Sequence, residues 1–221
     1  KQLATPEVNV CTIEDPIEMV EPSFNQMQVQ TVIDLSFAEG VRALMRQDPD
    51  IIMVGEIRDL ETAEVAIQAA LTGHLVLSTL HTNDAPAAVT RLLDLGLPSY
   101  LISATVLGVM AQRLVRVLCP SCKEVRPATA EDNAMWDRLV APWKANRPSQ
   151  FHHPVGCLDC RMTGYRGRVG LYEVLTLDDD LRDRIGSGAS ILEIRRTVRQ
   201  KGLHSIGHHA AERVEAGATT L

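Results

Sequence analysis

Short apolar runs alternate with helix-like segments through the first half of the chain, and this alternation constrains the fold more than any other feature. Each apolar run is rich in branched residues and ends at a turn or a polar cluster, which is typical of strands. The runs lie at 8–13, 50–55 and 75–80. Helical patterns lie at 36–47, 60–71, 84–95 and 99–117. Such alternation predicts an α/β fold with a mostly parallel sheet and helices on both faces.

The second half of the chain has a different texture. The segment before residue 119 is strongly acidic, whereas the remainder is slightly basic, and the break coincides with the first of four clustered cysteines. The stretch 126–154 shows no sustained period, while a short strand at 171–175 and helices at 190–200 and 205–215 are expected. We therefore expect three regions, which are listed by residue number as 1–118, 119–163 and 164–221.

Charge and hydropathy exclude several classes of protein. The 221 residues carry a net charge of -6, which disfavours binding to nucleic acid through bulk positive charge. The longest apolar stretch, 97–111, is too short to span a membrane and contains serine and threonine. Residues 1–6 lack the apolar segment of a secretory signal. We expect a cytoplasmic protein that reaches a membrane only through partners.

Polar side chains gather where the three expected strands end. Because the carboxyl ends of parallel strands share one edge of a sheet, these side chains should lie close together. Carboxylates at such an edge suit a hard cation and an activated water, although each could instead cap a helix. The residues are Glu14, Asp15 and Glu18, then Glu56, Arg58 and Asp59, then Thr79, His81, Thr82, Asn83 and Asp84.

Two C-x-x-C pairs carry the second chemical signal. Cys119 with Cys122 and Cys157 with Cys160 could together form a tetrahedral thiolate site for structural Zn²⁺. The long interval between the pairs indicates an inserted subdomain. Redox pairs and disulfides are the alternatives, and disulfides are disfavoured in a cytosolic chain. Cys11 lies in an expected strand and is read as a core thiol.

Three long segments resemble motifs of the secretion ATPase superfamily that drives type II secretion and type IV pili. Residues 12–18 resemble its aspartate box, 46–59 its atypical Walker B segment and 73–85 its histidine box. The resemblance covers nearly the whole chain. It implies a RecA-like P-loop NTPase core that binds ATP and Mg²⁺ and works as a homo-hexamer.

The resemblance also implies roles for single residues. Glu56 would polarise the attacking water, and Glu14 with Asp15 would hold Mg²⁺ and orient the γ-phosphate region. Gly55 stands where Walker B segments usually carry aspartate, so magnesium must rely on other groups. Such roles fit phosphoryl transfer, which needs positioning and charge neutralisation more than covalent chemistry.

Histidines and arginines complete the roles that the resemblance implies. His74 and His81 would sense the γ-phosphate or relay to the neighbouring subunit. Arg42, Arg46 and Arg58 are candidates for an arginine finger or nucleotide contact, and plain surface charge is the alternative for each.

One family motif is missing from the sequence. No G-x-x-x-x-G-K-[ST] phosphate loop occurs in the 221 residues, and in the family this loop lies upstream of the aspartate box. Without its backbone N–H groups and lysine, the triphosphate has no cradle. We therefore expect a C-terminal part of a longer protein that does not hydrolyse ATP at a useful rate by itself.

The cysteines separate branches of this superfamily. A tetracysteine insertion resembles the secretion and pilus assembly branch and is generally missing from pilus retraction motors. The resemblance therefore implies the ATPase motor subunit of a type II secretion system, peripheral to the bacterial inner membrane and working with a membrane platform and adaptor proteins. The alternatives are a type IV pilus assembly ATPase, a non-catalytic zinc-stapled interaction module, and a DNA-translocating motor, which the net charge disfavours.

Overall fold

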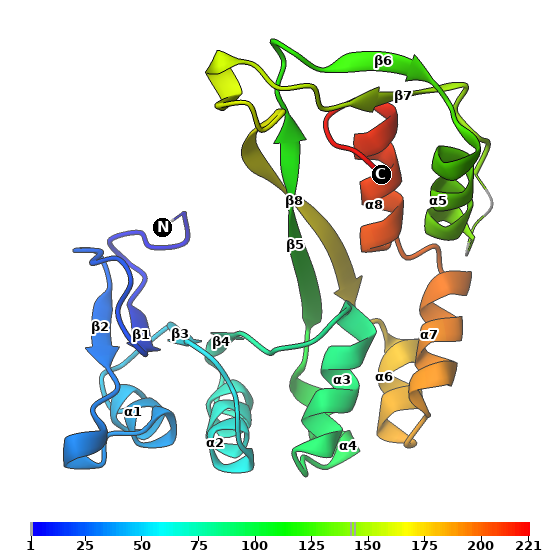
Figure 1. Ribbon diagram of the computed structural model, residues 1–221. Coiled ribbons are helices and arrows are strands. Elements are labelled where there is room, and N and C mark those ends of the chain that lie inside the picture. The colour runs from blue at the N-terminus through cyan, green and yellow to red at the C-terminus, as the bar shows by residue number, and fades with distance from the viewer. Residues whose placement is uncertain (1, 142, 144) are drawn as a thin grey trace. The chain divides into compact units, whose positions relative to one another are not determined.

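The computed structural model describes residues 2–141, 143 and 145–221. The chain divides into two compact units, and each is taken here by itself (Figure 1). Unit 1 comprises Lys1–Gly108 and Thr176–Thr197, and unit 2 comprises Val109–Leu175 and Val198–Leu221. Across the described residues, no helix combines the length and the apolar character needed to cross a bilayer.

Unit 1 is built on a four-stranded parallel sheet. Its strands are β1 (Val10–Glu14), β2 (Asn25–Gln28), β3 (Ile51–Val54) and β4 (Leu75–Ser78), in the order β2-β1-β3-β4. All three neighbouring pairs are parallel, so the four carboxyl ends lie at one edge. The structure confirms the parallel sheet and the three predicted strands. β2 was not anticipated, because its sequence NQMQ has neither branched residues nor an apolar run.

Two helices cover the same face of this sheet. α1 (Phe37–Leu44) and α2 (Leu60–Leu71) lie on one side of the strands in Figure 1. The buried core between these helices and the sheet is formed by Cys11, Ile13, Ala38, Val41, Leu44, Ile52, Val54, Val65 and Ala69. An apolar run of this kind is typical of a buried strand, but Leu75 and Leu77 of β4, an edge strand of this sheet, are 37% and 42% exposed.

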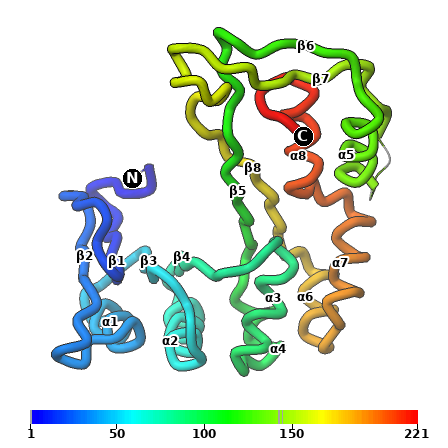
Figure 2. Tube along the Cα trace, in the orientation of Figure 1, coloured from blue at the N-terminus to red at the C-terminus, as the bar shows by residue number. Residues whose placement is uncertain are grey.

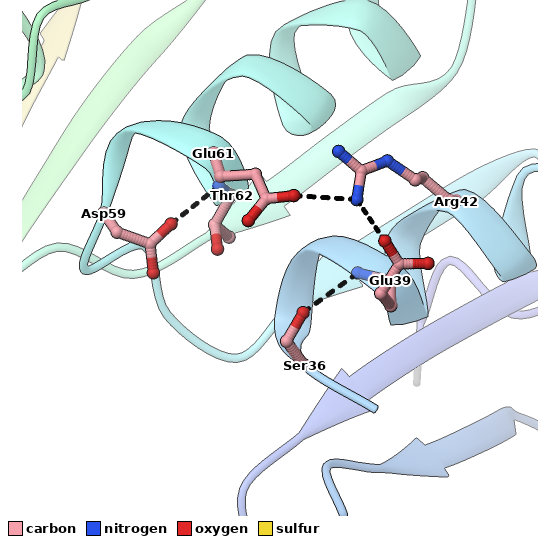
Figure 3. A network of polar contacts seen from close by, with 6 residues as sticks. All are labelled: Ser36, Glu39, Arg42, Asp59, Glu61 and Thr62. Carbon is pink, nitrogen blue, oxygen red and sulfur yellow. Dashed lines mark hydrogen bonds and ion pairs between the residues drawn. The ribbon is translucent and has the colours of Figure 1, made fainter. Parts of the chain in front are cut away.

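Side chains cap the start of each helix, and an arginine links the two helices. The Ser36 hydroxyl accepts a hydrogen bond from the Glu39 amide at 3.2 Å, and Asp59 Oδ1 accepts one from the Thr62 amide at 2.8 Å. Arg42 of α1 joins Glu39 to Glu61, which lies in the first turn of α2 (Figure 3). The caps satisfy N–H groups that the helix itself leaves without acceptors.

The remaining helices of unit 1 come from distant parts of the chain. They are α3 (Ala85–Asp94), α4 (Ser99–Thr105), α6 (Asp179–Gly186) and the first part of α7 (Ile191–Gln200). α4 and α6 pack side by side in both Figure 1 and Figure 2. Arg182 Nη1 donates to the Ser103 carbonyl at 2.5 Å, and Ser99 Oγ donates to the Gly186 carbonyl at 3.1 Å. The late segment 176–197 therefore belongs to the first unit.

The prediction of a single long helix at 99–117 is wrong. The helix α4 ends at Thr105, where Val106 turns extended, and the strand β5 (Gly108–Leu118) follows. β5 contains three valines and pairs with β8 (Tyr165–Thr176) in a two-stranded sheet. Pairing with this distant strand overrides the helix-like spacing of the apolar residues.

Unit 2 carries a small subdomain with its own core. β6 (Glu124–Pro127) pairs antiparallel with β7 (Gln150–His153), and α5 (Ala130–Val140) and α8 (Ile206–Glu215) pack beside them. The core contains Trp136, Val140, Phe151, Ala211 and Val214. The helix α5 is not among those expected from the sequence, although Thr129 and Asp132 form a capping box at its start. Two short 3₁₀ turns, Thr31–Ile33 and Leu158–Cys160, complete the described elements.

Candidate active site and metal centre

Backbone hydrogen bonds hold the loops of the carboxyl edge together. The Gly55 amide donates to the Ile13 carbonyl at 2.8 Å, which ties the loop after β3 to β1. The Ile57 amide donates to the Thr79 carbonyl at 3.0 Å, and Thr79 Oγ1 donates to the Gly55 carbonyl at 2.6 Å. The segments that follow β1, β3 and β4 are thus fixed relative to one another, as the parallel topology requires.

Glu56 lies at the centre of this edge, with its side chain only 14% exposed. One carboxylate oxygen, Oε1, pairs with the Arg58 guanidinium. The other, Oε2, is buried, and His81 Nε2 lies 3.3 Å from it. No described residue makes a well-aligned hydrogen bond to Oε2. The lone pairs of this oxygen therefore remain available to a further donor.

The charge of Glu56 is stabilised by its neighbours. The hydrogen bond from Arg58 is the main cause that lowers the pKa of the Glu56 carboxyl, and His81 adds to it against the opposing effect of burial. In turn, Glu56 raises the pKa of the Arg58 guanidinium, and the charge of Asp15 contributes in the same direction. Asp15 therefore acts electrostatically on the same cluster, and Glu56 is a carboxylate at neutral pH.

Glu14 ends β1 and is held from two sides. Thr12 Oγ1 donates to Glu14 Oε1 at 2.6 Å, and Gln26 Nε2 donates to the same oxygen at 2.9 Å. Thr12 is fully buried, so its hydroxyl is a fixed donor. Both hydrogen bonds use Oε1, an arrangement that lets Oε2 serve as a cation ligand. Gln26 is not among the residues expected at this edge, because the sequence of its strand β2 carries no strand signal.

The structure brings together some of the predicted residues and separates others. His74 lies at the start of β4, opposite the carboxyl edge, where its Nδ1 is 2.9 Å from the Ala69 carbonyl. Arg42 is occupied with two glutamates on α1 and α2. Arg46 follows the end of α1, on the side that leads into β3. The predicted residues that meet at the carboxyl edge are Glu14, Asp15, Glu56, Arg58 and His81.

Four cysteines meet in unit 2. The ligand sulfurs of Cys119, Cys122, Cys157 and Cys160 all lie within 4.8 Å of one another. Three of the sulfur pairs, 119–157, 122–160 and 157–160, are 3.8 Å apart. Thiolates that bind a tetrahedral Zn²⁺ at about 2.3 Å lie roughly 3.8 Å from one another. The spacing of the sulfurs therefore fits zinc, and four protein ligands would leave no open coordination position.

Backbone donors prepare these sulfurs for a cation. The Gly156 amide donates to Cys122 Sγ at 3.3 Å, and the amides of Cys157 and Gly164 donate to Cys160 Sγ at 3.2 Å each. Burial opposes ionisation of Cys160, but these donors outweigh burial and lower its pKa to about 6. A backbone hydrogen bond from Cys160 opposes the shift, but burial and the contacts with the sulfurs of Cys160 and Cys122 raise the pKa of Cys157 to about 11. A cation bound among these sulfurs would favour their thiolate form.

Comparison with known proteins identifies relatives of the whole chain. The family model described as type II/IV secretion system protein matches residues 1–221. The chain is 57% identical over 221 residues to the type IV pilus assembly ATPase TfpB of Acinetobacter baylyi, covering all of this chain and 37% of that protein. It is 47% identical over 221 residues to the type II secretion system ATPase E of Vibrio cholerae, covering all of this chain and 43% of that protein.

A solved structure has the same fold. The crystal structure of the pilus retraction motor PilT with bound ADP matches with a TM-score of 0.65 and 27% sequence identity, over 96% of this chain and 50% of that one. Thus the chain spans about two fifths of the length of the curated relatives and half of the solved motor. The fold is that of a P-loop ATPase.

Proposed function

The chain belongs to the type II/IV secretion system protein family. On this premise we propose that it provides two parts of an ATP-driven motor: the carboxyl edge of the sheet, at which ATP is hydrolysed, and a zinc subdomain. The observation that carries the proposal is the juxtaposition of Glu56 and His81 at the carboxyl edge of the sheet. An ionised, largely buried carboxylate at that edge is suited to orient a nucleophilic water. The relatives named above are called ATPases, and PilT binds ADP, which supports the same activity here.

The residues at the carboxyl edge would have different roles in hydrolysis. Glu56 Oε2 would hold the attacking water and accept its proton as the oxygen bonds to the γ-phosphorus and the bond to the leaving ADP oxygen breaks. Glu14 and Asp15 would hold Mg²⁺, which neutralises charge on the phosphates when it is bound. His81, which is 89% exposed, contacts Glu56 and is free to reach the γ-phosphate or a neighbouring subunit.

The triphosphate cradle must be supplied outside these 221 residues, because no phosphate-loop motif occurs within them. The candidate residues Arg42, Arg46 and His74 lie away from the Glu56 cluster, so we propose that they act on a neighbouring subunit or on the fold. Only Arg58 of the three arginines contacts the cluster directly.

The zinc subdomain has a structural role in this proposal. A site closed by four cysteines holds the loops 119–122 and 157–160 together without chemistry of its own. We further propose the assembly that the resemblance implies: a homo-hexameric, cytoplasmic ring that docks on an inner-membrane platform and adaptor proteins. The names of the relatives support such a machine at the coarse level of secretion and pilus assembly.

Two cargo systems fit this motor. The family resemblance of the sequence implies the type II secretion motor, which would drive pseudopilus assembly and protein export. The type IV pilus assembly motor is the second candidate, and the higher identity to TfpB, 57% against 47% to the secretion ATPase, favours it. In this proposal both systems would use the same carboxyl edge of the sheet, so the mechanism of ATP hydrolysis does not depend on the cargo.

The decisive experiment measures ATP hydrolysis by the protein that includes a phosphate-loop segment upstream of residue 1. We expect steady-state turnover, and Glu56→Gln should reduce kcat by roughly 100-fold or more while nucleotide binding persists. Glu64→Gln, on the exposed side of α2, is the matched control and should keep the wild-type rate. If Glu56→Gln retains most of the activity, Glu56 is not the residue that activates the water. If no variant hydrolyses ATP, the chain is better described as a zinc-stapled interaction module.

A further inference from the structure

The loop that carries His81 enters α3 at Asp84, and both oxygens of this carboxylate are engaged. Asp84 Oδ1 accepts a hydrogen bond from the Ala87 amide at 2.9 Å and caps the helix. Asp84 Oδ2 accepts one from Arg195 Nη2 at 2.8 Å, across 111 residues of sequence. The two side chains are 32% and 39% exposed, so the ion pair is partly shielded from solvent. One aspartate therefore joins the His81 loop to a helix near the end of the chain.

The backbone that carries Arg195 is itself well fixed. Ile194 and Thr197, on either side of it in α7, are 1% and 6% exposed. Glu193 Oε2 accepts hydrogen bonds from the Ser190 amide at 2.7 Å and the Ser190 hydroxyl at 2.8 Å, and these bonds secure the start of the helix. The guanidinium of Arg195 thus extends from a rigid element, which limits the entropy lost when it pairs with Asp84.

The His81 side chain, by contrast, has little to hold it. It is 89% exposed and lies against Glu56, at 3.3 Å between Nε2 and Oε2. Thr82 Oγ1 donates to the Asp84 carbonyl at 3.2 Å, so the short segment from His81 to Asp84 is folded onto the helix start. An exposed side chain keeps its place only if the backbone beneath it is fixed. This loop is held at Thr79 before His81 and at Asp84 after it.

We propose that Arg195 is a positioning residue for ATP hydrolysis: through Asp84 it holds the loop that keeps His81 against Glu56. The inference rests on the proposed function of the Glu56 edge. Arg195 touches neither the reacting atoms nor Glu56, so its effect is on the geometry of the transition state and not on the affinity for nucleotide.

The test compares four variants of the protein that includes the phosphate-loop segment. Asp84→Asn is the sharpest, because asparagine still caps α3 but no longer pairs with Arg195 as an anion. We expect Arg195→Gln and Asp84→Asn each to lower kcat by roughly threefold to tenfold with KM for ATP changed less than twofold. Arg195→Lys should recover part of kcat, and Arg196→Gln, an exposed neighbour, should match the wild type.

A double-mutant cycle separates a lost pair from two unrelated defects. The double variant of Arg195→Gln and Asp84→Asn should be no slower than the slower single variant, since both remove one interaction. Wild-type kcat in Arg195→Gln, a change confined to KM, or effects that multiply in the double variant would each overturn the inference. Glu56→Gln is measured alongside. If Glu56→Gln hydrolyses ATP at the wild-type rate, the proposed function fails. If Glu56→Gln loses hydrolysis but Arg195→Gln keeps the wild-type kcat, only the inference about Arg195 is overturned.

A second measurement uses the 221-residue chain and needs no catalysis. Amide hydrogen exchange should be faster over residues 81–87 in Arg195→Gln than in the wild type, and unchanged over the same residues in Arg196→Gln. Unchanged exchange over 81–87 in Arg195→Gln contradicts the positioning role even if the rate of hydrolysis falls.

Discussion

His81 Nε2 lies 3.3 Å from Glu56 Oε2, although the two residues follow different strands of the sheet. The contact exists because β3 and β4 are parallel neighbours, so the loops after them leave the sheet at the same edge. Arg58 approaches the other oxygen of the same carboxylate. The ionisation of Glu56 therefore depends on two basic residues, one from its own loop and one from the next.

The first prediction concerns Arg58 and the pKa of Glu56. Arg58→Gln removes the principal cause that holds this pKa below its usual value, so the pKa of Glu56 should rise. A carboxyl with a depressed pKa stabilises the fold above its unfolded-state pKa, and this contribution is lost as pH falls through the folded-state pKa. The wild type should therefore exceed the variant in unfolding free energy near neutral pH, and the difference should vanish in acid.

Carbon-13 NMR titration of the glutamate carboxyls in the 221-residue chain measures this shift directly. Because the Arg58 side chain is 63% exposed, added salt should shrink the difference between wild type and variant. Arg46→Gln, which lies away from the cluster, serves as the control and should leave the Glu56 titration unchanged. A Glu56 titration unaffected by Arg58→Gln would contradict the proposed electrostatic link.

The second prediction concerns zinc. We expect one Zn²⁺ per chain, and removal by a strong chelator or by Cys157→Ser should lower the thermal stability of unit 2. Both tryptophans, Trp136 and Trp143, lie in unit 2, so their fluorescence reports on this unit alone. Cys11→Ala is the control: it alters the core of unit 1 and should leave the zinc content at one ion per chain.

Metal analysis measures the zinc content, and thermal melting followed by tryptophan fluorescence measures the stability of unit 2. A chain with no zinc and an unaltered tryptophan melting curve after chelation would show that the four sulfurs do not depend on a metal. Loss of zinc from Cys11→Ala would likewise contradict the assignment of the ligands.

The third prediction concerns the core of the subdomain in unit 2. Trp136 is fully buried, its ring lies 5.9 Å from that of Phe151, and its Nε1 donates to the Asn146 carbonyl at 3.1 Å. Trp136→Ala leaves a cavity and an acceptor without its donor, so it should cost about 3–5 kcal/mol of unfolding free energy. Trp136→Phe should cost less, and urea denaturation followed by circular dichroism measures both. Equal losses in the two variants would contradict the packing argument.

Much of unit 1 could be predicted from the sequence because its signals are local. The apolar runs of β1 and β3 and the helix at 60–71 follow from composition and period. β2 carries no such signal, since it owes its conformation to pairing with β1. The strand β5 has apolar residues at spacings that also fit a helix, and only its partner β8 decides between them.

The contacts at the candidate sites also differ in how far the sequence predicts them. The cysteine spacing alone predicts that four sulfurs meet, because two C-x-x-C turns have one obvious way to complete a tetrahedron. The Glu56–His81 contact follows from the parallel topology. The pairing of Asp84 with Arg195 has no signal in the sequence, because the cap of one helix and a residue of another meet only through the packing of α7 in unit 1.

The last prediction concerns the start of α2, directly after the loop that carries Glu56 and Arg58. Asp59 Oδ1 accepts a hydrogen bond from the Thr62 amide at 2.8 Å, and this cap sets the residue at which the loop ends and α2 begins. Asp59→Ala should lower the unfolding free energy by about 1 kcal/mol, whereas Asp59→Asn, which can still cap, should lose only a few tenths. Urea denaturation followed by circular dichroism measures both variants. If the asparagine variant were as unstable as the alanine variant, the charge of Asp59 and not its cap would be the stabilising feature.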